Sequence, residues 1–313
     1  MKGAAAVDLK SSSHPLLGIA LKVGATLVFM FMAVIARGFG DTFPVGQVVF
    51  FRSLFAFIPI LVVMLVSGMR ISDLSTKVPW SHARRAASGV LAMFTYFSSL
   101  MYLPIADVTA ISFASPLIVV VLAAFILGET VRLYRWSAVA AGFAGVLIMV
   151  SPHLGDGLSG AGASTGVLLA FANAFLVAFT MIFIRLMSGS EPALVIAFYF
   201  QLACTLISAC TLPFAWTTPS SGEFLLLVTL GILGGVGQLL LTNSYRFAEA
   251  STLANFDYAA MIWAILLGWL FFSELPAPAV YFGAVIVIGS GLFIVWRERQ
   301  LGLRRVDDGV EPI

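Results

Sequence analysis

The sequence predicts an all-α polytopic membrane protein whose ten transmembrane helices form two inverted five-helix repeats. Three observations lead to this prediction: the composition, the spacing of the apolar stretches and an internal repeat. The 313 residues are 60% hydrophobic and 10% charged, with a mean hydropathy of +1.04. A soluble domain carries about 25% charged residues. Lipid must therefore be the solvent for most of the chain, which excludes a soluble enzyme, a nucleic-acid-binding protein and a disulfide scaffold.

Ten apolar stretches are each long enough to cross the hydrocarbon layer as a helix, which needs about 20 residues. Their continuous apolar character differs from the alternating pattern of a membrane barrel strand. The connections are short and contain helix-breaking residues such as Pro104 and Pro152. The spans are expected at about 16–36, 45–66, 84–103, 106–127, 134–151, 164–186, 192–213, 223–245, 250–272 and 277–297.

The distribution of basic residues predicts the orientation of the chain. Fourteen of the 17 Lys and Arg residues fall on the side that holds both termini, Arg37 falls on the other side, and Lys22 and Arg52 fall inside spans. Cytoplasmic loops are the ones rich in Lys and Arg, so both termini are predicted to be cytoplasmic. The expected organisation is a cytoplasmic tail (1–15), a first repeat (16–151), a periplasmic linker (152–163), a second repeat (164–297) and a cytoplasmic tail (298–313).

The two halves resemble each other most clearly around the fourth and ninth spans. The segment from Tyr102 to Glu129 matches the segment from Tyr245 to Glu274, and each contains Thr-x-x-[Ser/Asn]-Phe. The offset is 143 residues early and 145 residues late. Each half holds five spans, an odd number, so the second half enters the membrane from the opposite side. Such inverted repeats are typical of secondary carriers, although a duplicated scaffold without transport is the alternative.

Several residues and short motifs lie at particular places in the predicted spans. They are Phe51-Arg52, Pro116, Gly128-Glu129, Trp136 and Gly142-x-x-Gly145 in the first half, and Tyr258-Ala259-Ala260, Glu274 and Gly283 in the second. With the five-plus-five repeat, they make the sequence resemble the drug/metabolite transporter superfamily, in its ten-span EamA-like branch. Within it, the sequence is similar to bacterial carriers of riboflavin and of S-adenosylmethionine. The resemblance implies an inner-membrane carrier without an ATPase, and the chain has no GxxxxGK[ST] loop.

Two polar stripes at helical spacing are candidates for a substrate cavity. Polar side chains inside the bilayer are costly and usually face a cavity or a partner. The stripes lie at equivalent positions of the third and eighth spans and comprise Thr95, Ser99 and Tyr102 in one and Gln238, Thr242 and Tyr245 in the other. They are expected to line a shared cavity, or alternatively to form hydrogen bonds between helices.

The fourth and ninth spans supply a second pair of candidate faces. Ser112 belongs to the first, and Asn255 and Tyr258 belong to the second. Asn255 and Tyr258 have side chains that can hydrogen-bond to a planar ligand or stack on it. Pro116 removes a backbone hydrogen bond and is expected to kink the fourth span, either as a hinge or as a packing kink.

Three full charges lie inside the predicted spans: Lys22, Arg52 and Asp257. At 1.5 Å per residue, Lys22 and Asp257 lie about 9–10 Å inside the cytoplasmic end, which permits an ion pair between them. Asp257 is either a structural partner of Lys22 or a group that responds to a proton, a cation or a cationic substrate. Lys22 and Arg52 have a second interpretation, in which their long side chains extend to the lipid headgroups.

The sequence therefore indicates a secondary transporter of a small organic metabolite that works by alternating access. On the resemblance, riboflavin uptake is the leading substrate, and export of amino acids, drugs or other metabolites, or transport of S-adenosylmethionine, are the alternatives. The driving force is the substrate gradient or a coupled proton or cation gradient. An intramembrane enzyme is disfavoured because the spans lack paired carboxylates and His ligands, and a channel because ring-like selectivity motifs are absent. No cofactor, metal or nucleic acid is expected, the partners are the substrate and the bilayer, and the oligomeric state is open.

Overall fold

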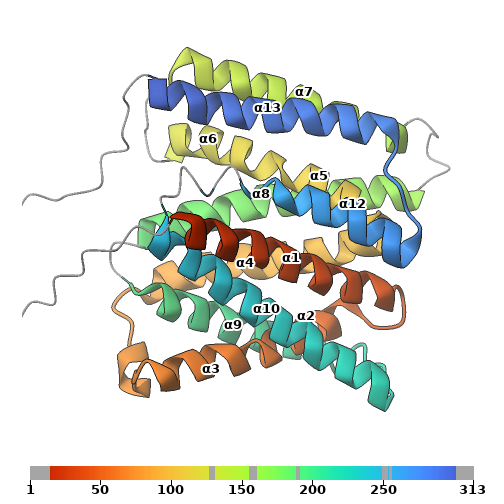
Figure 1. Ribbon diagram of the computed structural model, residues 1–313. Coiled ribbons are helices and arrows are strands. Elements are labelled where there is room, and N and C mark those ends of the chain that lie inside the picture. The colour runs from red at the N-terminus through yellow and green to blue at the C-terminus, as the bar shows by residue number, and fades with distance from the viewer. Residues whose placement is uncertain are drawn as a thin grey trace, which may run out of the picture.

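The computed structural model describes residues 15–126, 131–154, 161–187, 191–248, 253 and 256–300, and all regular elements in these ranges are helical (Figure 1). The helices are α1 (Pro15–Phe39), α2 (Val45–Phe55), α3 (Phe57–Val66), the 3-10 helix η1 (Ile71–Leu74), α4 (Pro79–Tyr102), α5 (Ile105–Ser112), α6 (Ala114–Ile126), α7 (Leu133–Leu154), α8 (Ala161–Met187), α9 (Ala193–Ala209), α10 (Ser221–Phe247), α12 (Ala259–Phe272) and α13 (Pro278–Gln300).

Most helix starts follow from local sequence signals. Helices α2, α5 and α9 begin directly after a proline, whose fixed φ angle suits the entry to a helix. Helix α10 begins with a capping box, in which the Ser220 hydroxyl accepts a hydrogen bond from the Glu223 amide and the Glu223 carboxylate accepts one from the Ser220 amide. Helix α4 begins at Pro79, five residues before the predicted span.

Two of the predicted spans are each broken into two helices. The first break, at Ala56, separates α2 from α3, and the second, at Phe113, separates α5 from α6. Each break lies three residues before a proline, Pro59 in one case and Pro116 in the other, because proline cannot donate to the carbonyl four residues earlier. At the second break the Ser115 hydroxyl donates to the carbonyl of Ser112 instead (2.8 Å). The structure thus has the interruption expected at Pro116.

The helices pack in pairs that run across the whole molecule. Helix α7 lies along α13 at one edge, and α2 lies against α9 at the opposite edge (Figure 1). Between these edges α1 packs along α10 and α4 packs along α8. Helix α12 contacts α1 and α5, while α6 contacts α8. The central layers, built from α1, α4, α5, α8, α10 and α12, carry most of the predicted site residues.

Seven of the helical stretches are long and apolar enough to cross a membrane: Leu16–Phe39, Val45–Val66, Ile105–Ile126, Leu133–Pro152, Gly162–Ile184, Ser221–Ser244 and Pro278–Arg297. Two shorter apolar helices, Leu194–Ala209 and Ala259–Phe272, accompany them. The chain is therefore a polytopic membrane protein.

Glycine lets the two edge helices α7 and α13 approach very closely. A β-carbon added at Gly145 would overlap the backbone carbonyl of Gly283, and one added at Gly283 would overlap that of Gly145. Helices in lipid gain little from the hydrophobic effect, so close backbone contact through small residues is a principal source of their association. The glycine-rich fifth and tenth spans noted in the sequence are accordingly the two that pack together.

Candidate functional site

The polar stripe of the third span lies on α4, and we call it the α4 stripe. Its Thr95 and Ser99 hydroxyl groups donate hydrogen bonds within α4. Thr95 is half-buried and donates to the carbonyls of Leu91 and Ala92 (2.9 and 3.1 Å). Ser99 is fully buried and donates to the Tyr96 carbonyl (2.7 Å). Hydroxyl groups bonded to their own helix keep free lone pairs, so they can still accept a hydrogen bond from a ligand.

Tyr102 closes the α4 stripe at its C-terminal end and is 46% exposed. Its Cβ packs against Gly166 of α8. One α8 side chain also crosses to α4, since the Asn173 amide donates to the carbonyl of Ala92 (2.7 Å). The α4 stripe therefore lies along the α4–α8 contact.

The polar stripe of the eighth span lies on α10, and we call it the α10 stripe. In it, the side-chain amide of Gln238 makes no hydrogen bond to a described residue and can bind a ligand. Gln238 is half-buried. The Thr242 hydroxyl donates to the Gln238 carbonyl (2.8 Å). The side chain of Tyr245 lies outside the described residues. Helix α4 packs on α8 and α9 while α10 packs on α1 and α2, and no hydrogen bond between described residues joins the two stripes.

The break between α5 and α6 in the fourth span lies against the start of α12 in the ninth. The Ser112 hydroxyl donates to the Val108 carbonyl (2.8 Å), and the ring of Phe113 packs edge-on against the ring of Tyr258 (5.3 Å between centroids). The Tyr258 hydroxyl points at Gly291 of α13, where a β-carbon would collide with it. Tyr258 therefore reaches toward α13. Asn255 lies outside the described residues.

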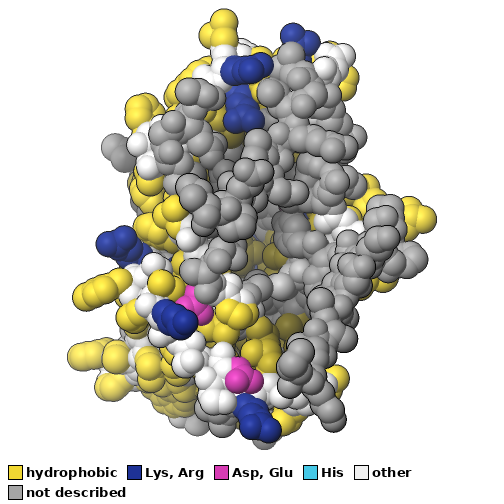
Figure 2. Space-filling model, turned by 90° about the vertical axis from the view of Figure 1, so that its left-hand side faces the viewer, with side chains coloured by type: hydrophobic (Ala, Val, Ile, Leu, Met, Phe, Trp, Pro, Cys, Tyr) yellow, Lys and Arg dark blue, Asp and Glu magenta, His cyan; other side chains and the backbone are white. Residues whose placement is uncertain are grey.

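The ion pair allowed by the depths of Lys22 and Asp257 is present. Lys22 Nζ lies 2.6 Å from Asp257 Oδ1. The Lys22 side chain is 3% exposed and the Asp257 side chain is 49% exposed, so the pair is open on the Asp257 side. At the end of the molecule where α1 begins and α13 ends, Figure 2 shows several basic side chains and a smaller number of acidic ones. Asp257 is thus a carboxylate that water or a ligand can reach.

A second ion pair lies at the opposite end of the same two helices. Arg37, near the end of α1, pairs with Glu274, just after α12. Arg37 also donates to the carbonyls of Leu100 and Leu103 at the end of α4. Three segments from both halves of the chain therefore meet at this one guanidinium group.

The backbone at the end of α12 directs Glu274 toward Arg37. Ser273 adopts a left-handed conformation (φ 56°), and the amide of Glu274 donates back to the carbonyl of Gly268 (3.2 Å). The amide of Ser273 also donates to the carbonyl of Trp269 (3.0 Å), which is the bond expected where a helix ends with a left-handed residue. The turn reverses the chain sharply, which places the carboxylate against α1.

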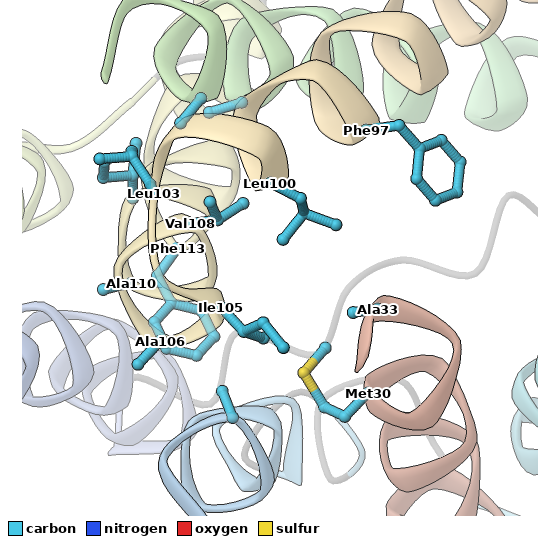
Figure 3. Close-up of a cluster of buried hydrophobic side chains, with 14 of the residues drawn as sticks. Met30, Ala33, Phe97, Leu100, Leu103, Ile105, Ala106, Val108, Ala110 and Phe113 are labelled. Atoms are coloured by element: carbon cyan, nitrogen blue, oxygen red, sulfur yellow. The ribbon is translucent and has the colours of Figure 1, made fainter. Parts of the chain in front are cut away.

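Beside this ion pair, apolar side chains fill the space between α1, α4 and α5. Figure 3 shows Met30 and Ala33 of α1 facing Leu100 of α4 and Ile105 of α5. All four are buried, with exposed fractions of 0–7%. Leu100 contributes both to this apolar cluster and, through its carbonyl, to the Arg37 contact. We call the Arg37–Glu274 pair and this cluster the outer closure.

The two remaining interior cations are buried in protein. Arg52 is 2% exposed and donates from Nη1 to Oε1 of Gln201 on α9 (2.9 Å). With Lys22 at 3%, neither side chain extends toward the headgroups, so that alternative is wrong for both residues. Arg85 is one of the fourteen basic residues expected on the cytoplasmic side. It is only 8% exposed, and its guanidinium group lies over the ring of Phe200 (3.9 Å to the centroid).

A groove of about 480 Å³ runs between the start of α1 and the end of α10. It is lined by Leu17, Leu21, Val236, Leu239, Leu240, Asn243 and Phe247. The lining is almost entirely apolar and contains none of the predicted stripe residues. Its place between two long membrane helices suits contact with lipid acyl chains.

Arg37, Glu274 and Arg85 are absent from the site residues predicted from the sequence. The sequence positions of Arg37 and Glu274 are distinctive, whereas that of Arg85 is not. Arg37 is the single basic residue on the outer side of the predicted topology, and Glu274 ends the second copy of the repeat. Arg85 follows Arg84 at the start of a span, so its position looks like that of a loop cation. Only the packing of α4 on α9 distinguishes the two neighbours.

Comparisons with known proteins agree with this architecture. The sequence profile of the EamA-like transporter family matches residues 16–151 and again residues 164–296. A solved crystal structure has the same fold, with a TM-score of 0.64 at 23% identity, and the match covers 91% of this chain and 98% of that one.

Three characterised relatives are bacterial transporters with different named cargoes. The S-adenosylmethionine uptake transporter of Rickettsia prowazekii is 29% identical over 81% of this chain and 84% of its own. The riboflavin transporter of Rhizobium johnstonii is 29% identical over 82% and 83%. The pseudopaline exporter of Pseudomonas aeruginosa is 28% identical over 87% and 93%. The family expected from the motifs is confirmed: the chain belongs to the EamA-like transporter family and is a transporter, not an enzyme.

Proposed function

We propose that the chain is a secondary transporter that carries a small organic metabolite across the bacterial inner membrane by alternating access. Its ten spans are the seven long apolar helical stretches, the shorter helices α9 and α12, and α4. Both termini are cytoplasmic, which places the basic side chains seen in Figure 2 on the inner side.

The packing supports two repeats related by an approximate two-fold axis. Exchanging each span of one half for its counterpart turns the α1–α10 contact into the α8–α4 contact, and the α6–α8 contact into the α12–α1 contact. The α2–α9 and α7–α13 contacts map onto themselves. An odd number of spans in each half makes the two repeats inverted.

The single observation that carries the mechanism is the difference between the ends of the α1–α12 pair. The outer end is closed by Arg37, Glu274 and the carbonyls of α4, while Asp257 at the inner end is 49% exposed. This difference supports the inference that the structure is an inward-facing state. Exchanging the conformations of the two halves would break the outer closure and cover the inner end, which is alternating access.

Riboflavin is the first substrate candidate, on the resemblance and on the named relative. The test is growth of a bacterial strain that cannot make riboflavin, supplied with the vitamin at micromolar concentration. Growth that depends on this chain supports uptake. Normal membrane insertion without growth contradicts it and favours export or another substrate.

A second candidate class, metabolites with an anionic group such as the carboxylate of S-adenosylmethionine, is favoured by a specific observation. Two buried arginines, Arg52 and Arg85, have no carboxylate within salt-bridge distance among the described residues. Counterflow in proteoliposomes decides whether either class is carried: preloaded unlabelled compound accelerates entry of the labelled one only in a carrier.

A further inference from the structure

Arg52 and Arg85 lie together in the interior between α2, α4 and α9. Arg52 of α2 contacts Gln201 and Arg85 of α4 contacts Phe200, and these two partners are neighbouring residues of α9. Cys204, one turn further along α9, is fully buried. Both guanidinium groups thus face the same stretch of α9, and both arginine residues are more than nine-tenths buried.

Their hydrogen-bonding capacity is mostly unused. The recorded partners are Gln201 for Arg52 and the Phe200 ring for Arg85, and neither brings a negative charge. The Nε of Arg52 and both Nε and Nη1 of Arg85 are buried without a hydrogen-bond partner. Leaving such a charge desolvated and uncompensated costs several kcal/mol, so natural proteins retain it where a counter-charge arrives.

The surroundings are shaped to hold the guanidinium groups in place. A β-carbon at Gly89 would overlap both Nη1 of Arg85 and the ring of Phe200. The Nε of Arg52 lies against Gly234 of α10, where a β-carbon would be 3.0 Å away. Fixed guanidinium groups present planar, bidentate donors that match carboxylate and phosphate oxygens.

We propose that Arg52 and Arg85 form an anion-binding subsite that holds the carboxylate or phosphate of the transported molecule. This rests on the proposed transport function and favours organic anions and zwitterions over an uncharged molecule such as riboflavin as the cargo.

The two halves of the chain differ in the residues at the positions of Arg52 and Arg85. Such a difference suits the binding of a molecule that is itself asymmetric. Counting from the prolines that precede α2 and α9, Arg52 corresponds to Phe200, and with the repeat offset of 143 Arg85 corresponds to Val228. The cations are therefore present on one side of the approximate two-fold axis alone. A metabolite has two unlike ends, so an asymmetric pair of arginines fixes which end binds where.

The test measures thermal unfolding of the purified full chain in nanodiscs by tryptophan fluorescence. The probes are inorganic phosphate and succinate, each compared with sodium chloride at equal ionic strength. We expect at least one of the two anions to raise the transition temperature by about 2–4 °C. If neither raises it, the proposal is wrong.

The matched variants are Arg52→Gln, Arg85→Gln and Arg84→Gln, the last being the exposed neighbour on the same helix. We expect the first two to lose the anion response and Arg84→Gln to keep it. Without anion, Arg52→Gln and Arg85→Gln should unfold at or above the wild-type temperature, because each removes an uncompensated buried charge. An unchanged anion response in both, or a lowered transition temperature with the response retained, would assign the arginines a structural role.

A further variant keeps the test decisive if either glutamine variant fails to fold. Gly89→Ala leaves both charges in place and displaces the Arg85 side chain, so we expect a weaker anion response. A full response in Gly89→Ala would contradict the geometry proposed here. The transport function is tested separately by counterflow. If an uncharged substrate shows counterflow while the arginines bind no anion, this inference alone is overturned. If the arginines bind an anion but no compound shows counterflow, the transport function is overturned.

Discussion

Helices α1 and α12 are joined by an ion pair at each end, and the two pairs differ in their surroundings. Lys22–Asp257 joins α1 to the residues just before α12 and leaves the Asp257 side chain half-exposed. Arg37–Glu274 is reinforced by two carbonyls of α4 and lies beside a cluster of buried apolar side chains. An ion pair reached by water contributes little and can exchange partners, whereas a partly buried, multiply bonded one resists opening. In the proposed transport cycle, this difference makes the Arg37 end the closed one and the Asp257 end the responsive one.

Breaking the outer closure should have the largest effect. Glu274→Gln removes the charge from a charge-assisted hydrogen bond worth about 1.5–3 kcal/mol. We expect the outward-open state to gain population by about tenfold or more and net uptake to fall by a similar factor. Radiolabelled uptake in proteoliposomes measures this effect.

Asp41→Asn is the matched control, because Asp41 is an exposed carboxylate at the same end of α1. Its uptake should equal that of the wild type. A Glu274→Gln variant with wild-type uptake would show that the outer pair does not hold the structure closed.

Asp257→Asn tests the inner pair and should have the next largest effect. It leaves the buried Lys22 ammonium facing a neutral partner, so we expect a severalfold loss of uptake and a flatter dependence of uptake on pH. The double variant Lys22→Gln/Asp257→Asn should recover part of the loss, because it removes the unpaired charge as well. Unchanged rate and pH dependence in Asp257→Asn would remove Asp257 from the mechanism.

Pro116→Ala tests whether the break between α5 and α6 is a hinge. Alanine restores a donor for the carbonyl of Ser112 and favours a continuous helix. If the break moves during transport, we expect uptake to slow by about two- to threefold with the transition temperature unchanged or raised. An unaltered rate would identify the break as a packing kink.

Ser273→Gly should have the smallest effect. Glycine adopts the left-handed conformation without strain, so the variant should unfold slightly above the wild type and transport normally. Ser273→Val should lower the free energy of unfolding by about 1–2 kcal/mol, because valine is strained in the left-handed conformation. It should also displace the Glu274 carboxylate from Arg37. Equal behaviour of the two variants in thermal unfolding and uptake would show that the turn does not position Glu274.

That the chain is an all-helical membrane protein could be predicted from the sequence, because lipid imposes a one-dimensional signal. Apolar runs of fixed length need no knowledge of packing. The orientation drawn from the asymmetry of Lys and Arg stays a prediction. Depth along a span is equally one-dimensional, which is why Lys22 and Asp257 could be paired in advance. The break near Pro116 was also foreseeable, since proline removes a particular hydrogen bond wherever it stands in a helix.

The contacts that depend on which helix lies beside which could not be foreseen in the same way. Arg85 and Arg84 are identical in type and adjacent in sequence, and only the neighbouring α9 buries the first. Glu274 required the left-handed turn at Ser273, a conformation that serine rarely adopts. The polar stripes on α4 and α10 stay a prediction, since their hydroxyl groups bond within their own helices and the side chains of Tyr245 and Asn255 lie outside the described residues.

The most direct test of alternating access measures one distance at each end of the molecule in nanodiscs. Spin labels at Asp41 and Leu275 report the outer end, and labels at Leu16 and Leu133 report the inner end, with the exposed Cys210 replaced by Ser. In Glu274→Gln, the account predicts a longer outer distance together with a shorter inner distance, relative to the otherwise unchanged protein. Two distances that stay fixed, or that lengthen together, would contradict it.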